Sequence, residues 1–243
     1  LHQPAQSRDH TERMLSAMGA SITQEGKTLR ITPCQNLNPV NIRVSGDISS
    51  ASFWIVAAIA HPKAKIRLDN VGINPTRSGI VDVLQNMGAN ISLINVRSEG
   101  GEPVSDMIVE SSDLVGVDID KDIIPIIQDE IPILALAACF AKGNTVIRDA
   151  EELRYKESDR LNTTAVELSK LGAKIKEYPD GLLIEGTGTL SGGSCKAHND
   201  HRIAMMLGIA GLLAKDPVTI TGSEVVDISY PHFWSDLENI LKV

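Results

Sequence analysis

One eight-residue phrase occurs three times in the chain and limits what the chain can fold into. It reads LSAMGASI from Leu15, LQNMGANI from Leu84 and LSKLGAKI from Leu168. Each copy contains a helix end, a glycine suited to a left-handed C-cap, and the start of a strand. A chance match at three places is improbable, so the phrase predicts repeated β/α units, with an incomplete last copy.

Three apolar runs, residues 51–60, 131–141 and 203–214, each follow a polar cluster. The last two are apolar nearly all round, which is typical of helices that are buried on every side. They are too short to cross a bilayer, which takes about 20 residues. We therefore predict an α/β (α+β) fold in which buried central helices are surrounded by strands and amphipathic helices.

Local patterns predict the remaining elements. An alternating pattern favours a strand over residues 40–44, and the polar, glycine-containing residues 95–105 favour an exposed loop. Other strands are expected over residues 21–23, 28–32, 65–68, 90–94, 107–110, 145–148 and 218–221, near Ile175 and near Leu183. Other helices are expected over residues 7–18, 77–87 and 231–241.

Composition narrows the classes of partner. The net charge of -8 argues against nucleic acid, although a local basic cluster can still bind a phosphate. Cys34, Cys139 and Cys195 lack paired spacing, so we expect no disulfide framework, no zinc site and a reducing compartment. No signal peptide, P-loop or dinucleotide fingerprint is visible in the sequence.

Polar residues at the starts of the apolar runs suggest an anion site. Asp47, Asp129 and the pair Asp200 and Arg202 stand at these starts. If the repeats pack around a pseudo-threefold axis, the helix N-termini share one face, where their free amides favour anions. Capping is the simpler explanation for each acidic residue alone. It does not explain Arg202, a cation in a first helical turn.

The stretch LRYKESDRL from Leu153 is expected to open an amphipathic helix. Helical spacing would place Lys156, Glu157 and Arg160 on neighbouring faces of one turn, where they can hold an anion and exchange a proton with it. On spacing alone, a solvated helix start with internal ion pairs is the better explanation. Together with Arg202, however, the stretch gives three cations at helix N-termini, which suggests that something negative lies between them.

Two residues carry weaker signals. His201 stands beside a capping pair, where a histidine is more often structural than catalytic. Arg8, next to Asp9 and His10, fits a surface ion pair and a phosphate contact equally well.

Six motifs in order along the chain carry a resemblance to a known family. They are SRDHTERML from Ser7, GDISSASFW from Gly46, QDEIPILALAA from Gln128, LRYKESDRL from Leu153, NDHRIAMM from Asn199 and SYPHFW from Ser229. The chain closely resembles the 5-enolpyruvylshikimate-3-phosphate synthase (3-phosphoshikimate 1-carboxyvinyltransferase) family. The related UDP-N-acetylglucosamine enolpyruvyl transferases do not carry the KESDR and NDHR pair.

The resemblance implies an enolpyruvyl transferase-like fold, an inside-out α/β barrel with three β/α repeats in each of two domains. Residues 1–44 would be the end of the first (N-terminal) domain, and residues 45–243 most of the second (C-terminal) domain. The chain starts with Leu1 rather than Met. We therefore expect a fragment whose partner is the missing N-terminal half and which is inactive alone. A non-catalytic folded half that binds a partner chain is the alternative.

The resemblance also implies a reaction and residue roles. The enolpyruvyl group of phosphoenolpyruvate would move to the 5-hydroxyl of shikimate 3-phosphate, with release of phosphate. Asp129 would be the base and a shikimate ligand, and Glu157 the proton donor and acceptor, with Lys156 beside it. Arg160 and Arg202 would clamp phosphoenolpyruvate, and Arg8 is a lesser candidate for the shikimate phosphate.

Other implications of the resemblance concern conditions and inhibitors. We expect a cytoplasmic enzyme of aromatic amino acid biosynthesis and a glyphosate target, with no cofactor, metal, nucleic acid or membrane partner. Some family members have a lysine where this chain has Ile228, so one basic contact to phosphoenolpyruvate is absent or supplied elsewhere.

Overall fold

Three helices form the centre of the molecule in the computed structural model, which describes residues 1–3, 7–33, 36–119 and 121–240. They are α2 (Ile48–Ala60), α5 (Ile131–Cys139) and α7 (His201–Leu213), and each packs against the other two. Every residue of α5 is buried, as are most residues of α2 and α7. The predicted buried central helices are confirmed, because helices without a polar face find no stable place at a surface.

A three-stranded antiparallel sheet covers α2, in the order β3-β5-β4. The first unit consists of α2 and four further elements. They are β3 (Lys65–Gly72), α3 (Gly79–Asn86), β4 (Asn90–Glu99) and β5 (Glu102–Glu110). The loop predicted over residues 95–105 is wrong, because β4 and β5 continue as a hairpin through this segment, with Arg97 opposite Val104. Gly100 and Gly101 turn the chain with positive φ, and the polar composition reflects exposed hairpin strands rather than a loop.

The second unit places a mixed sheet, in the order β6-β7-β9-β8, beside α5 and α6. Its strands are β6 (Asp118–Ile119), β7 (Gly143–Ile147), β8 (Lys174–Tyr178) and β9 (Gly181–Gly186). Its helical segments are α4 (Ile124–Ile127), η1 (Glu151–Tyr155) and α6 (Arg160–Lys170). Together with α5, these elements repeat the order of the first unit, as the repeated phrase predicted.

The third unit is smaller. Two parallel strands, β10 and β11, form its sheet among the described residues. Its elements around α7 are β10 (Gly193–Lys196), β11 (Val218–Thr221), η2 (Ser223–Ile228) and α8 (Phe233–Ile240). That the last copy is incomplete remains a prediction from the sequence.

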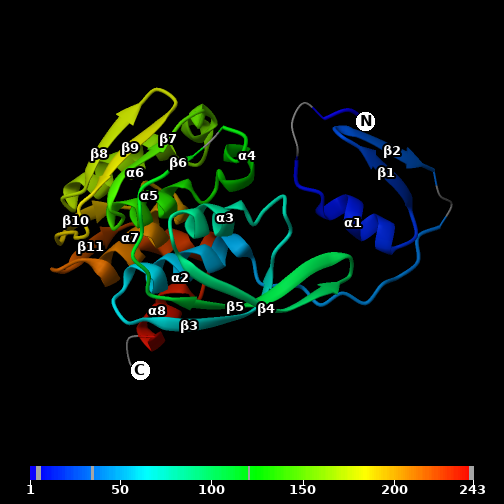
Figure 1. The fold of residues 1–243 in the computed structure, drawn as a ribbon, viewed down its shortest axis with the longest axis horizontal. Helices are drawn as coiled ribbons and strands as arrows, with labels where there is room; N and C mark the ends of the chain where they lie inside the picture. Colours follow the sequence, from blue (N-terminus) through cyan, green and yellow to red (C-terminus); the bar gives the residue numbers. More distant parts are fainter. Residues whose placement is uncertain (4–6, 34–35, 120, 241–243) are drawn as a thin grey trace.

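An N-terminal unit of one helix and one hairpin lies apart from these layers (Figure 1). It contains α1 (His10–Ala17), β1 (Ser21–Glu25) and β2 (Thr28–Thr32). The helix begins at His10 rather than Ser7, and the Asp9 carboxylate binds Arg13 and Asn74 instead of capping it. Leu29 is the one buried hydrophobic residue among the described residues up to 44.

The strand predicted over residues 40–44 is wrong. This segment connects the N-terminal unit to α2 and has no strand assignment. An alternating pattern makes a strand only where a neighbouring strand can pair with it, and Ile42 and Val44 are instead exposed. The domain boundary near residue 44 remains a prediction. No helix within the described ranges is long and apolar enough to cross a membrane.

Candidate active site

The N-termini of the three central helices meet at one polar cluster. Ser49 of α2 donates a hydrogen bond to Glu130 at the start of α5. Arg160 at the start of α6 donates to Asp129, before α5, and to Asp200, before α7. The expectation that these helix starts share one face is therefore confirmed, and α6 contributes its own N-terminus to the same face.

Asp129 lies between arginines of two distant segments. Its Oδ2 is 2.7 Å from Arg8 Nη2, and its Oδ1 is 3.1 Å from Arg160 Nη1. The N-cap position of α5 is Glu130 rather than Asp129, and no side-chain hydrogen bond to that cap is found within the described residues, so capping does not account for Asp129. Burial opposes ionisation, but Arg8, Arg202 and Arg160 together lower the pKa of Asp129 to about 2. The side chain is therefore a carboxylate in this arrangement.

Arg160 is enclosed rather than open to an anion, because only 1% of its side chain is exposed. Its Nε lies 2.9 Å from Asp200 Oδ2, and its Nη2 lies 2.6 Å from Glu157 Oε2. With the bond to Asp129, one guanidinium joins three carboxylates. Although burial opposes it, Arg160 lowers the pKa of Asp200 below its ordinary value.

Lys156 and Glu157 precede a helix instead of forming its first turn, so the predicted shared turn is wrong. Asp159 caps α6 by accepting from the Asn162 N–H, and the helix begins only at Arg160. The side-chain hydrogen bond of Asp159 competes with helix formation before it. Glu157 still reaches Arg160 and remains 47% exposed, while Lys156 Nζ lies 3.5 Å from Glu152 Oε1. Glu157 therefore stands at the rim of the cluster, whereas the ion pair of Lys156 is with Glu152, outside it.

Arg202 stands in the first turn of α7, beside the cluster. Asp200 caps α7 by accepting from the Arg202 backbone N–H at 2.9 Å, so capping is confirmed for Asp200. The Arg202 Nε is buried and has no hydrogen-bond partner among the described residues. The charge of Arg202 also helps to lower the pKa of Asp129, and it offsets part of the rise that burial causes in the pKa of Glu130. A buried guanidinium N–H without an acceptor is a place for an anionic ligand.

His201 is buried at the same helix start. Burial and the neighbouring Arg202 lower its pKa, which favours the neutral ring. Its Nδ1 is buried and lacks a hydrogen-bond partner within the described part of the chain.

The sequence placed Glu130 with Asp129 in the polar cluster before α5 but gave it no role in the site, and it did not single out Arg77. Glu130 is buried beneath Asp129, and burial raises its pKa to about 7 despite the bond from Ser49. Arg77 Nη2 lies 2.7 Å from Ser49 Oγ and 3.0 Å from Asp47 Oδ1. Glu130 stands directly before an all-apolar helix, which was a usable signal for burial. Nothing local in the sequence pointed to Arg77.

The cluster has the chemistry of a site for anions and proton transfer. Cations from three segments, Arg8, Arg160 and Arg202, surround the Asp129 carboxylate, and Glu157 stands at the edge. No group of three metal-ligating side chains suited to a metal ion was found among the residues that the structure describes.

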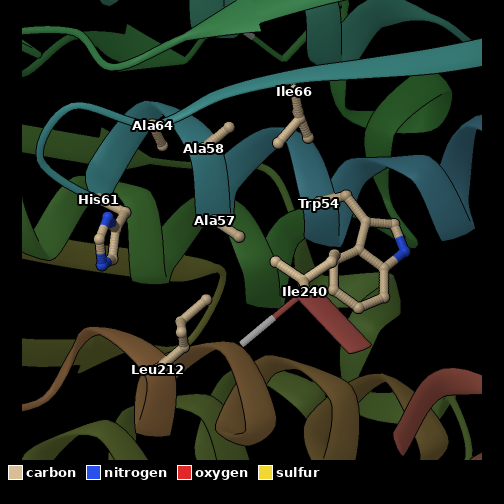
Figure 2. A pocket seen from close by; sticks show the side chains of 8 residues that line it. All are labelled: Trp54, Ala57, Ala58, His61, Ala64, Ile66, Leu212 and Ile240. Carbon is tan, nitrogen blue, oxygen red and sulfur yellow. The ribbon is translucent and has the colours of Figure 1, made fainter. Parts of the chain in front are cut away.

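A separate apolar pocket of about 220 Å³ lies toward the other ends of α2 and α7 (Figure 2). Its lining includes Trp54, His61 and Leu212, together with Ile240 of α8. Figure 2 shows these side chains around a space without a carboxylate or a guanidinium. The pocket is thus chemically distinct from the polar cluster at the helix N-termini.

Comparisons with known sequences point in one direction. Residues 2–237 match the family described as "EPSP synthase (3-phosphoshikimate 1-carboxyvinyltransferase)". A 3-phosphoshikimate 1-carboxyvinyltransferase from Desulforudis audaxviator is 52% identical over 98% of this chain and 56% of its own length. One from Roseiflexus castenholzii is 51% identical over 96% of this chain and 55% of its own length. The chain therefore spans about half the length of these curated relatives.

Solved structures show the same partial coverage. An EPSP synthase from Acinetobacter baumannii aligns with a TM-score of 0.94 and 41% identity, over 98% of this chain and 55% of that one. The enolpyruvyl transferase NikO from Streptomyces tendae aligns with a TM-score of 0.73 and 21% identity, over 98% of this chain and 54% of that one. The second likeness shows the shared fold alone.

Proposed function

Because this chain belongs to the EPSP synthase family, we propose that it forms one wall of an active site that makes an enolpyruvyl ether. In that reaction the enolpyruvyl group of phosphoenolpyruvate moves to the 5-hydroxyl of shikimate 3-phosphate, and phosphate is released. The observation that carries the proposal is the buried Arg202 Nε, whose charge acts on Asp129 and which has no acceptor in the part of the chain that the structure describes. Both substrates are anions that would supply that acceptor.

The chemistry requires one base and one acid that later exchanges its proton. The 5-hydroxyl oxygen bonds to C2 of phosphoenolpyruvate while its proton leaves to a base, and C3 accepts a proton. The resulting tetrahedral adduct then loses phosphate, and C3 returns its proton to restore the double bond. In our proposal Asp129 is the base, Glu157 exchanges the C3 proton, and Lys156 lies beside Glu157.

Substrate binding would make Asp129 a better base. Its pKa of about 2 depends on Arg8, Arg202 and Arg160. When a substrate carboxylate or phosphate binds Arg202 and Arg8, those guanidinium groups share their charge with the ligand. The pKa of Asp129 then rises toward the range in which a carboxylate can remove a proton.

We propose different roles for the two arginines of the phosphoenolpyruvate clamp. Arg202 offers a buried donor to the ligand, as described above. Arg160 is engaged by three carboxylates, so its first role is to hold Asp129, Glu157 and Asp200 in place. Direct contact between Arg160 and phosphoenolpyruvate requires Glu157 or Asp129 to turn away.

The opposite wall of the site would come from a segment equivalent to the rest of the relatives' length. The N-terminal unit supports this, because α1 buries none of its residues and Met14 and Ile31 are exposed. A helix and hairpin with so little buried apolar area need a further layer for stability. We propose that this layer is the N-terminal half of the enzyme, either linked to this chain or separate.

Reconstitution tests this function. The 243-residue chain would be mixed with the part of the Desulforudis audaxviator enzyme that it does not match. Phosphate release from phosphoenolpyruvate and shikimate 3-phosphate is then measured, with Asp129→Asn as the inactive control. Release that depends on both substrates and both chains supports the proposal.

A tight but inactive complex would contradict the enzyme function, provided that the two parts of the relative itself reconstitute activity. That outcome would favour a non-catalytic folded half that binds a partner chain.

A further inference from the structure

Two successive residues before α7 adopt an unusual backbone conformation. His198 has a φ of 55° and Asn199 a φ of 56°, in the left-handed region. Few residues other than glycine enter this region, although asparagine and histidine do so more often than most. Such a bend persists only where its surroundings hold it. Asp200 and Arg202 follow it directly, so the bend decides where these two side chains lie.

A buried glutamate of α6 contacts this bend. None of the Glu167 side chain is exposed. Its Oε1 lies 2.6 Å from His198 Nε2, and its Oε2 accepts from the Lys196 backbone N–H at 3.0 Å. Lys170 Nζ, one turn along the same helix, binds both carboxylate oxygens. Burial works against ionisation, but these hydrogen bonds lower the pKa of Glu167 below its ordinary value.

The same helix contacts the bend at a second point. Arg160 is seven residues before Glu167, two helical turns or about 10 Å along α6, and it binds Asp200 through Nε at 2.9 Å. Helix α6 therefore contacts residues 196–200 at two points. Glu167 binds Lys196 and His198, and Arg160 binds Asp200, which follows the bend.

The backbone hydrogen bonds around the bend do not involve the side chain of His198. Ala197 N–H donates to Thr221 at 2.9 Å, and Asp200 N–H donates to the Ala197 carbonyl at 3.0 Å. These bonds close the bend but do not dictate a side chain at its first position. The bond to Glu167 is the interaction by which the His198 side chain ties the bend to α6.

We propose that Glu167 and His198 are positioning residues, which hold the left-handed bend so that Asp200 caps α7 and Arg202 points into the site. The effect of the Arg202 position on substrate binding rests on the proposed function. The positioning itself concerns the structure of this chain and can be tested without turnover.

The test uses the full chain and two matched variants. His198→Asn keeps a residue that tolerates positive φ, but its side chain is too short to reach Glu167, so it separates the contact from backbone strain. Lys170→Gln removes another partner of the same carboxylate and leaves the bend untouched. Hydrogen exchange of the Arg202 and Ala204 amides, which bond to Asp200, is the readout.

We expect about tenfold faster exchange of these two amides in His198→Asn, as for the loss of one charge-assisted hydrogen bond. Lys170→Gln should stay within about twofold of the wild type. Glu167→Gln, which keeps the side-chain shape, serves as a second variant and should accelerate the same amides. Unchanged exchange in His198→Asn, or equal acceleration in Lys170→Gln, would overturn the proposal.

Reconstituted activity adds a second readout. His198→Asn should raise the KM for phosphoenolpyruvate more than it lowers kcat, and Lys170→Gln should change neither. If the wild-type mixture releases no phosphate, the proposed function fails, while the exchange result still decides the positioning role.

Discussion

Arg8 Nη2 lies 2.7 Å from Asp129 Oδ2, although 121 residues separate them in the chain. This ion pair joins the N-terminal unit to the start of a central helix. It brings a cation from outside the units built around α2, α5 and α7 to the carboxylate that we propose as the base. Several measurable consequences follow from this arrangement and from the buried charges around it.

Removing Arg8 should raise the pKa of Asp129. Three arginines hold that pKa at about 2, and Arg8 contributes to this through both its hydrogen bond and its charge. In Arg8→Gln we expect a partial rise toward the ordinary value of about 3.9, because Arg160 and Arg202 remain. Carbon-13 NMR of the Asp129 carboxyl across an acid titration measures it. Arg13→Gln, which removes an arginine paired with Asp9, is the control and should leave Asp129 unchanged.

The same change should alter acid stability. A carboxyl whose pKa is lowered by folding stabilises the native state above its unfolded pKa, and that contribution is lost as the pH falls. For Asp129 the loss runs from about pH 4 down to about pH 2. Arg8→Gln should therefore lose stability less steeply over this interval than the wild type. Identical acid unfolding curves for the wild type and Arg8→Gln would contradict the assigned role of Arg8.

Glu130→Gln should become stabilising as the pH rises. The Glu130 pKa is raised to about 7, so the native state keeps a proton that the unfolded chain loses above about pH 4.5. Stability from this group therefore falls between about pH 4.5 and pH 7. Compared with wild type, the glutamine variant should gain on the order of 3 kcal/mol between pH 4.5 and pH 7.5.

Urea unfolding at these two pH values measures the difference. Glu238→Gln, which changes an exposed glutamate of α8, is the control. Parallel pH dependence in wild type and Glu130→Gln would show that Glu130 ionises normally.

Arg160→Met should destabilise the fold strongly. The guanidinium is buried and joins Asp129, Glu157 and Asp200, so its removal leaves like charges together without a cation. Breaking such a buried arrangement costs about 3–5 kcal/mol. Denaturant unfolding measures the loss. Arg67→Met is the matched control, since Arg67 also binds two carboxylates but is 54% exposed, and a far smaller loss is expected there.

Arg202→Ala should weaken phosphoenolpyruvate use without unfolding the chain. The Arg202 Nε makes no hydrogen bond to the described residues, so little internal bonding is lost with it. In the reconstituted enzyme we expect the KM for phosphoenolpyruvate to rise by about tenfold or more. Arg148→Ala, at an exposed position, should leave it unchanged. A normal KM in Arg202→Ala would remove Arg202 from the site.

The predictions that the structure confirmed rest on local properties of the sequence. An all-apolar helix such as α5 must be buried whatever surrounds it, and the glycine in each copy of the phrase marks a helix end. The expectations that failed depended on neighbours. Residues 40–44 alternate like a strand but have no pairing partner, whereas residues 95–105 look like a loop but find one in a hairpin.

Chemical roles were harder to assign than elements. The sequence identified Asp129, Glu157, Arg160 and Arg202 as site candidates, and the structure brings all four together. It did not reveal that Arg160 is enclosed by carboxylates while Arg202 keeps a free donor within the described residues. Two arginines at similar helix starts differ in this way because their neighbours come from other segments.

The sequence by itself determined the repeated units, the buried central helices and the family, because periodicity, glycine positions and motif order are properties of the chain alone. Tertiary structure alone decided the protonation and pairing of the site. It placed Arg8 on Asp129, buried Glu130 beneath it, and tied His198 to Glu167. Electrostatic interactions depend on distance and burial in space, and neither quantity can be read from separation along a sequence.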